Sequence, residues 1–107
     1  MHFLTKISIP NETGNKFVSG KDFNEKMDGL MSNLKPEAAY FCVSEGQRTI
    51  FALVNVEGSH ELTRVVEPFW LALNANIEMI PAMTQQDFGK AMPLVKQSVE
   101  KFYKPSP

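Results

Sequence analysis

The sequence predicts an α+β fold in which one domain, residues 1–107, is built on a four-stranded antiparallel sheet. Two observations predict this class. Short segments with the alternating apolar period of a strand are interspersed with segments that have the apolar period of a helix. The segment 47–83 has the pattern of a strand, a helix and a second strand, and a similar unit precedes it. A chain of 107 residues is the right size for one domain.

The first unit fills the N-terminal part of the chain. Apolar and polar side chains alternate over residues 2–9, which predicts a strand that ends at Pro10. Residues 11–16 are polar and rich in turn-forming types, so we expect a long loop there. One apolar stripe at helical spacing predicts a helix over 23–34, and residues 38–43 predict the second strand.

The second unit follows a hairpin turn at residues 45–47. Residues 49–56 predict the third strand, and the stripe within 62–73 predicts a helix. Pro68 is expected to bend or split that helix, because proline removes one backbone hydrogen bond. Residues 76–81 predict the fourth strand.

A last helix is expected after Thr84, which forms a capping-box pattern with Asp87. Pro93 should make it irregular, and residues 104–107 should fray. Its apolar positions recur at helical spacing: Phe88, Met92, Val95, Val99 and Phe102. Two right-handed crossovers then interleave into one sheet with both helices on one face, which is the ferredoxin-like arrangement.

Composition excludes several classes of partner. The 11 basic and 12 acidic residues show no basic cluster, so no nucleic-acid partner is expected. No apolar run reaches the roughly 20 residues that span a bilayer, and the start lacks a signal-peptide pattern, so we expect no membrane and a cytoplasmic location. Metal-ligand spacings and phosphate-binding loops are absent, so neither a metal nor a cofactor is expected. The single cysteine, Cys42, is expected to be a buried thiol.

The strands are apolar on both sides, which predicts a homodimer. In the third strand, Ile50, Ala52 and Val54 share one side, while Phe51 and Leu53 share the other. The helices can cover only one face of the sheet. A large exposed apolar patch is unusual on a soluble monomer, so the second face is expected to pack against the sheet of another copy.

Five segments carry a resemblance to known proteins: Ile9-Pro10 with Gly14-Asn15, residues 34–41, 46–49, 67–75 and 81–83. They resemble a family of small uncharacterised bacterial proteins within the dimeric α/β-barrel superfamily, which includes muconolactone isomerases and antibiotic-biosynthesis and haem-degrading monooxygenases. The resemblance implies the ferredoxin-like fold and dimerisation. It implies no activity, because the first strand lacks the Asn of the haem-degrading members and no acid/base pair of the isomerases has a match here.

Three candidate ligand-binding residues are expected on the barrel side of the sheet. His2 and Lys6 lie opposite the Phe3 and Ile7 face of the first strand, so they should point to the interior. Tyr40 alternates with its neighbours in the second strand and can offer its hydroxyl to a cavity. The alternative for His2 is a frayed chain end.

Three further candidates lie elsewhere. Trp70 can form the wall of a pocket, with core or dimer packing as the alternative. Arg48 opens the third strand, with an ion pair to Glu37 or Glu45 as the alternative. Asn15 can lie over a cavity mouth, with an ordinary turn as the alternative.

Three functions follow as hypotheses. The first is a homodimeric barrel that binds a small, mainly apolar molecule between its sheets. The second is a cofactor-independent monooxygenase or isomerase acting on a small aromatic or lactone-like substrate, with proton transfer by His2, Lys6 or Tyr40. The third is a purely structural or partner-binding module. The sequence leaves open whether the protein is an enzyme.

Overall fold

The structure is a computed structural model that describes residues 1–103. Its strands are β1 (His2–Ile9), β2 (Ala38–Ser44), β3 (Gln47–Asn55) and β4 (Asn76–Ala82). Its helices are α1 (Asn11–Val18), α2 (Phe23–Leu34), a short 3-10 helix η1 (Ser59–Glu61), α3 (Leu62–Leu73) and α4 (Gln85–Phe102). The predicted α+β class is confirmed. The tail expected at 104–107 lies outside the described residues.

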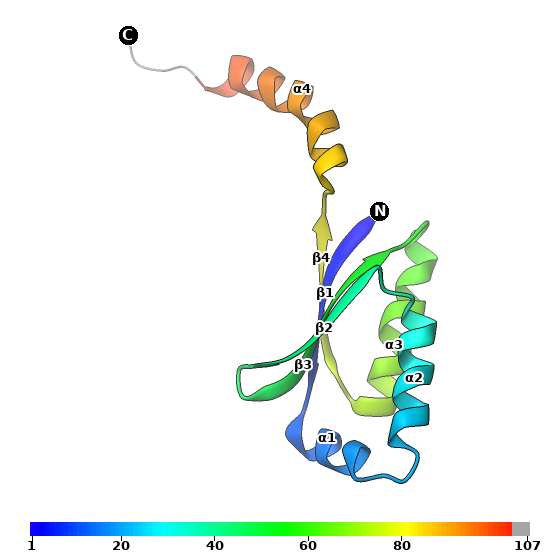
Figure 1. The fold of residues 1–107 in the computed structure, drawn as a ribbon. Coiled ribbons are helices and arrows are strands. Elements are labelled where there is room, and N and C mark those ends of the chain that lie inside the picture. Colours follow the sequence, from blue (N-terminus) through cyan, green and yellow to red (C-terminus); the bar gives the residue numbers. More distant parts are fainter. Residues whose placement is uncertain (104–107) are drawn as a thin grey trace.

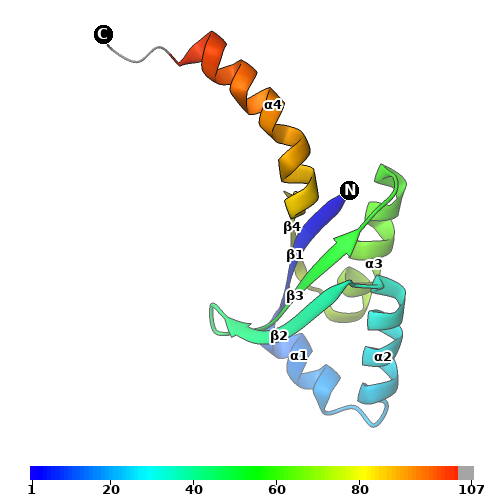
Figure 2. The same cartoon turned by 45° about the horizontal axis from the view of Figure 1, so that its top comes forward.

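The four strands form one antiparallel sheet in the order β2-β3-β1-β4. β3 therefore lies between β1 and β2, and β1 lies between β3 and β4, so each strand-helix-strand unit encloses a strand of the other. Helices α2 and α3 lie side by side on one face of the sheet (Figures 1 and 2). The hairpin between β2 and β3 turns at Glu45 and Gly46, which both have positive φ, as a two-residue type I′ turn requires.

The core lies between this helical face and the sheet. Strands β1 and β3 alternate, so that every second side chain points to the helices. Helices α2 and α3 contribute one buried stripe each, in agreement with the predicted helical pattern. The main buried side chains are Ile7, Ile9, Leu30, Leu34, Ile50, Ala52, Val54, Val65, Phe69 and Leu73.

Thr5 is a polar residue at the centre of this core. It is fully buried, and its hydroxyl has no hydrogen-bond partner among the described residues. An unsatisfied buried hydroxyl is unfavourable, so Thr5→Val should raise the free energy of unfolding by about 1 kcal/mol. Urea denaturation at constant protein concentration measures this change. Thr13→Val is the matched control.

The control should change stability in the opposite direction. The Thr13 hydroxyl donates to the carbonyl oxygen of Leu73 at 2.8 Å, so removing it leaves that acceptor unpaired. We expect Thr13→Val to lower stability by about 1 kcal/mol. A loss of stability in Thr5→Val equal to that in Thr13→Val would show that the Thr5 hydroxyl is satisfied in solution.

Residues 11–16 form part of helix α1, so the predicted loop is wrong. Contacts with the rest of the fold hold this helix despite its Gly and Asn residues, which disfavour helix. Thr13 bonds the C-terminal end of α3, and Gly14 is buried against Ile9 and Arg48. Lys16 lies 3.9 Å from Glu12 one turn away. Tertiary contacts therefore override the local preference.

Helix α3 is not split at Pro68 but runs on from Leu62 to Leu73. Proline at position 68 leaves the carbonyl of Arg64 without its helical donor. The side-chain amide of Asn33, from α2, donates to that oxygen at 3.1 Å. The Arg64 guanidinium in turn donates to the carbonyls of Asn33 and Leu34 at the end of α2. These reciprocal bonds replace the missing helical bond and join the two helices.

Helix α4 projects away from the sheet beyond the end of β4 (Figures 1 and 2). None of its residues is buried. The described chain measures 67 × 29 × 20 Å, and its radius of gyration is 18.4 Å. A compact domain of this length has a radius of gyration of about 13 Å. The apolar stripe of α4 is thus left uncovered by the described part of the chain.

The start of α4 confirms the predicted capping box. Thr84 Oγ1 accepts from the Asp87 backbone N–H at 3.1 Å, and the Thr84 N–H donates to Asp87 Oδ2 at 3.2 Å. The hydrogen bond from the Thr84 backbone N–H is the main cause that holds the pKa of Asp87 below its ordinary value. A hydrogen bond with the Thr84 side chain lowers this pKa further. The ionised form is therefore the one that stabilises the helix.

We expect the helix content of α4 to depend on pH for this reason. The stabilisation is fully present above the unfolded pKa of about 3.9 and is lost as the pH falls through the lowered folded value. Far-UV circular dichroism between roughly pH 5 and pH 2 should show this loss, and Asp87→Asn should remove it. Glu100→Gln, in the same helix but outside the cap, is the control and should keep the loss. An unchanged acid transition in Asp87→Asn would refute the role of the cap.

Candidate functional site

A cavity of about 380 Å³ lies on the helical side of the sheet, between α1, α2 and the hairpin end of β2 and β3. We call it the edge groove and define it by Phe17, Phe23, Met27, Phe41, Val43 and Arg48. Small-molecule sites are typically apolar concavities of roughly 300–1,000 Å³ with few polar groups. The edge groove has that size and character.

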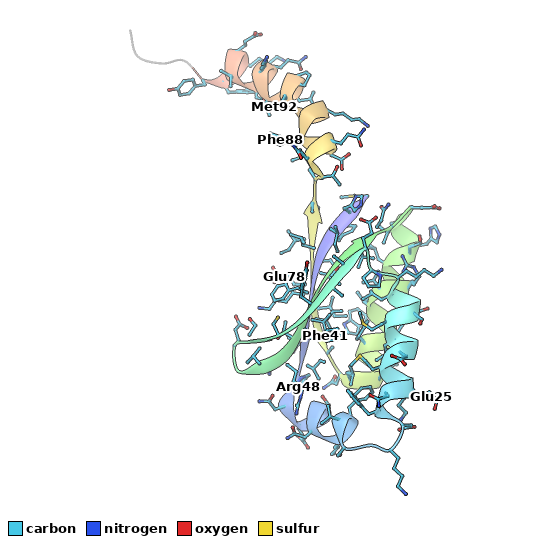
Figure 3. All side chains as sticks on the ribbon, viewed as in Figure 1. Glu25, Phe41, Arg48, Glu78, Phe88 and Met92 are labelled. Carbon is cyan, nitrogen blue, oxygen red and sulfur yellow. The ribbon has the colours of Figure 1, made fainter. Side chains whose placement is uncertain are left out.

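The groove exists because the helices leave the edge strand β2 uncovered. Phe41 pairs with buried Ile50 in the sheet register, so both point to the helical side. Yet Phe41 is 62% exposed and Val43 is 80% exposed. Figure 3 shows Phe41 on the side of the sheet that faces the helices.

Arg48 and Asn15 meet at this groove. Arg48, the second residue of β3, lies on the helical side of the sheet and close to α1 (Figure 3), and α1 contains Asn15. The guanidinium Nη1 donates to Asn15 Oδ1 at 3.1 Å. Neither alternative ion pair for Arg48 forms. Glu37 instead contacts His2, and Glu45 contacts Lys6. Asn15 also lies in a helix rather than in the predicted loop.

No helix within residues 1–103 covers the opposite side of the sheet (Figures 1 and 2), and we call this side the open face. Strand register aligns its side chains in transverse rows. One row is apolar: Ala38, Leu53, Leu4 and Ile80. The next row contains Tyr40, Phe51, Lys6 and Glu78. Figure 3 shows Glu78 on the side away from α2 and α3.

His2 and Lys6 both lie on the open face, as predicted, and each has an acidic neighbour. His2 Nε2 is 3.1 Å from both carboxylate oxygens of Glu37. Lys6 Nζ is 3.7 Å from Glu45. His2 is an ordered strand residue paired with Asn55 and Ala82, so it is not a frayed end.

The remaining candidates are dispersed. Tyr40 is exposed on the open face of the edge strand, and Trp70 is half exposed on α3 outside its buried stripe. Cys42 is exposed, so the predicted buried thiol is wrong. Its strand lies at the sheet edge, where only one neighbouring strand covers it, and its Sγ donates weakly to the Thr49 carbonyl at 3.5 Å.

Sequence reasoning missed the aromatic wall of the groove. Phe17 and Phe23 pack edge to face, with ring centroids 5.3 Å apart. Phe17 follows a polar segment that has no clear helical pattern, so only the contacts of α1 reveal its place. The role of Gly14 also emerges only from the structure, where a Cβ at that position would lie 2.8 Å from the Arg48 guanidinium.

No protein-family model and no curated protein sequence matches this chain. Within residues 1–103, no helix is both long and apolar enough to cross a bilayer. The same residues contain no cluster of three or more His, Cys, Asp or Glu side chains placed to hold a metal ion.

Proposed function

We propose that this protein is a homodimeric ferredoxin-like α/β barrel that binds a small, mainly apolar molecule between its two sheets. The uncovered apolar row on the open face carries the proposal. Leu4, Leu53 and Ile80 lie side by side there, with Phe51 in the adjacent row. A second copy that packs its own open face on this row would remove all of these side chains from water.

Helix α4 gives independent support. Its exposed apolar stripe includes Phe88 and Val95. Figure 3 shows the helix standing clear of the sheet. Most of the stability of a helix in a protein comes from packing of its apolar face, yet none of the 18 residues of α4 is buried. In a twofold dimer, α4 continues directly from a strand of the interface, so a partner can cover it.

The barrel interior would combine an apolar wall with a few polar groups. Lys6 is flanked in register by Phe51 and Glu78, and His2 lies at one end of the same strand face. Such a combination suits ligands that are mostly apolar and carry one or two polar atoms. The dimeric α/β-barrel superfamily is the group that this architecture resembles.

Proton transfer is the second candidate function, and the His2–Glu37 pair is the observation that favours it. A carboxylate within 3.1 Å of an imidazole nitrogen can orient the ring for general acid/base work. A cofactor-independent isomerase or monooxygenase would need this pair to face the bound substrate. Loss of turnover in His2→Gln, with binding retained, would identify such an enzyme.

Sedimentation equilibrium at micromolar concentration tests the dimer directly. The expected mass is twice the 12.1 kDa of one chain. A structure of that dimer then shows whether the space between the sheets is open or filled by side chains. An open space supports ligand binding, whereas a closed one reduces the interior to a purely structural interface. A monomeric mass would contradict the proposal.

A further inference from the structure

The body of the edge groove selects an apolar ligand. Phe17, Phe23 and Phe41 supply aromatic surface, and Met27 adds a flexible side chain that adapts to different shapes. Phe41 is exposed although it faces the helical side of the sheet. A molecule placed in the groove would cover this surface and gain the free energy of apolar burial.

Arg48 is the one charged residue among those that line the groove. A guanidinium stays protonated at all physiological pH values and has five N–H donors. Its hydrogen bond within the described chain goes to the neutral amide oxygen of Asn15, and none of the ion pairs among residues 1–103 involves it. The groove therefore combines an apolar body with one positive charge that no carboxylate neutralises.

The surroundings of Arg48 hold its guanidinium in place. Asn15 fixes Nη1 at 3.1 Å, and Gly14 leaves the space that the side chain occupies. A Cβ on residue 14 would lie 2.8 Å from Nη1 and 3.2 Å from Ile9 Cγ2. A guanidinium held in this way is suited to a planar carboxylate, which can accept two parallel hydrogen bonds.

We infer that the edge groove binds a small organic acid, with its apolar chain or ring on α1, α2 and β2 and its carboxylate paired with Arg48. This site lies on the helical side of the sheet, opposite the open face. It is therefore separate from the space between the sheets and does not depend on dimerisation.

Isothermal titration calorimetry of the full chain with decanoate and with 1-decanol tests the inference. The two probes share a ten-carbon chain and differ in the charged head. We expect saturable binding of decanoate that is roughly ten- to a hundredfold tighter than that of 1-decanol, as hydrogen bonds to a charged group predict. Arg48→Gln should abolish this difference. Lys16→Gln, which removes an exposed cation from the same region, should preserve it.

Gly14→Ala separates binding from folding. The added methyl group must displace the guanidinium, which is the flexible end of a side chain, so the fold should persist while the preference for decanoate falls. Equal binding of the two probes, or a preference that survives Arg48→Gln, would overturn the inference. The inference would also be overturned if a second copy of the chain occupied the groove. In that case Val43→Asp would dissociate the dimer, and decanoate would have no effect on dimerisation.

Discussion

Leu4→Asp is expected to convert the proposed dimer into a monomer. Leu4 lies at the centre of the apolar row, with Leu53 and Ile80 as its cross-strand neighbours. Because both of these neighbours are apolar, packing a second sheet on this row would bury the new carboxylate with no cation beside it in the row. An unpaired buried charge costs roughly 3–5 kcal/mol, which raises the dimer dissociation constant on the order of a thousandfold.

The matched control is Leu71→Asp. Leu71 is highly exposed on α3, on the helical side of the sheet, and the same chemical change there should leave the proposed dimer intact. Sedimentation equilibrium over a dilution series measures both variants. The sheet-to-sheet interface would be refuted if Leu4→Asp remained as dimeric as Leu71→Asp.

Phe69→Ala is expected to give the largest loss of folding stability. Phe69 is 1% exposed and forms the centre of the buried stripe of α3, between Val65 and Leu73. Removing a buried phenyl ring loses its burial energy and leaves a cavity, so we expect a cost of about 3–5 kcal/mol. Urea denaturation measures this cost, at a constant protein concentration because dimerisation would add to the apparent stability.

Two further variants make this result interpretable. Phe69→Leu keeps most of the volume and should cost clearly less than Phe69→Ala, which guards against a truncation too severe to measure. Leu71→Ala changes an exposed neighbour and should shift stability by no more than about 0.5 kcal/mol. A cost for Phe69→Ala as small as that for Leu71→Ala would mean that α3 does not pack on the sheet as described.

The positions of residues on the open face could be predicted from the sequence, whereas those of the residues in the edge groove could not. Alternation in β1 correctly placed His2 and Lys6 on the face opposite Ile7, because the two-residue period of a strand is a local property. The convergence of Arg48 and Asn15 was not predictable in this way. These residues are 33 positions apart, and a helix that was expected to be a loop brings them together.

Tertiary contacts also control two elements that local rules treated incompletely. Pro68 predicted a bend or a split in α3; the helix is not split, and the Asn33 amide from the neighbouring helix takes the place of the lost donor. Cys42 was expected to be buried because its segment is apolar, but its strand lies at the sheet edge. Neither the cross-helix bond nor the strand order can be read from the residues nearby in sequence.

By itself, the sequence determined the periodic elements of this protein: helix α2 over 23–34, the four strands and the capped start of α4. Those features depend on side-chain spacing and on hydrogen bonds within a few residues, which the order of amino acids records directly. Only the tertiary structure decided that α1 is a helix, that β2 leaves a groove at its side, and that Arg48 lies there without a carboxylate. These outcomes depend on contacts between segments that are distant in sequence. Such contacts form only when the chain packs, and their free energies exceed the local conformational preferences of the residues.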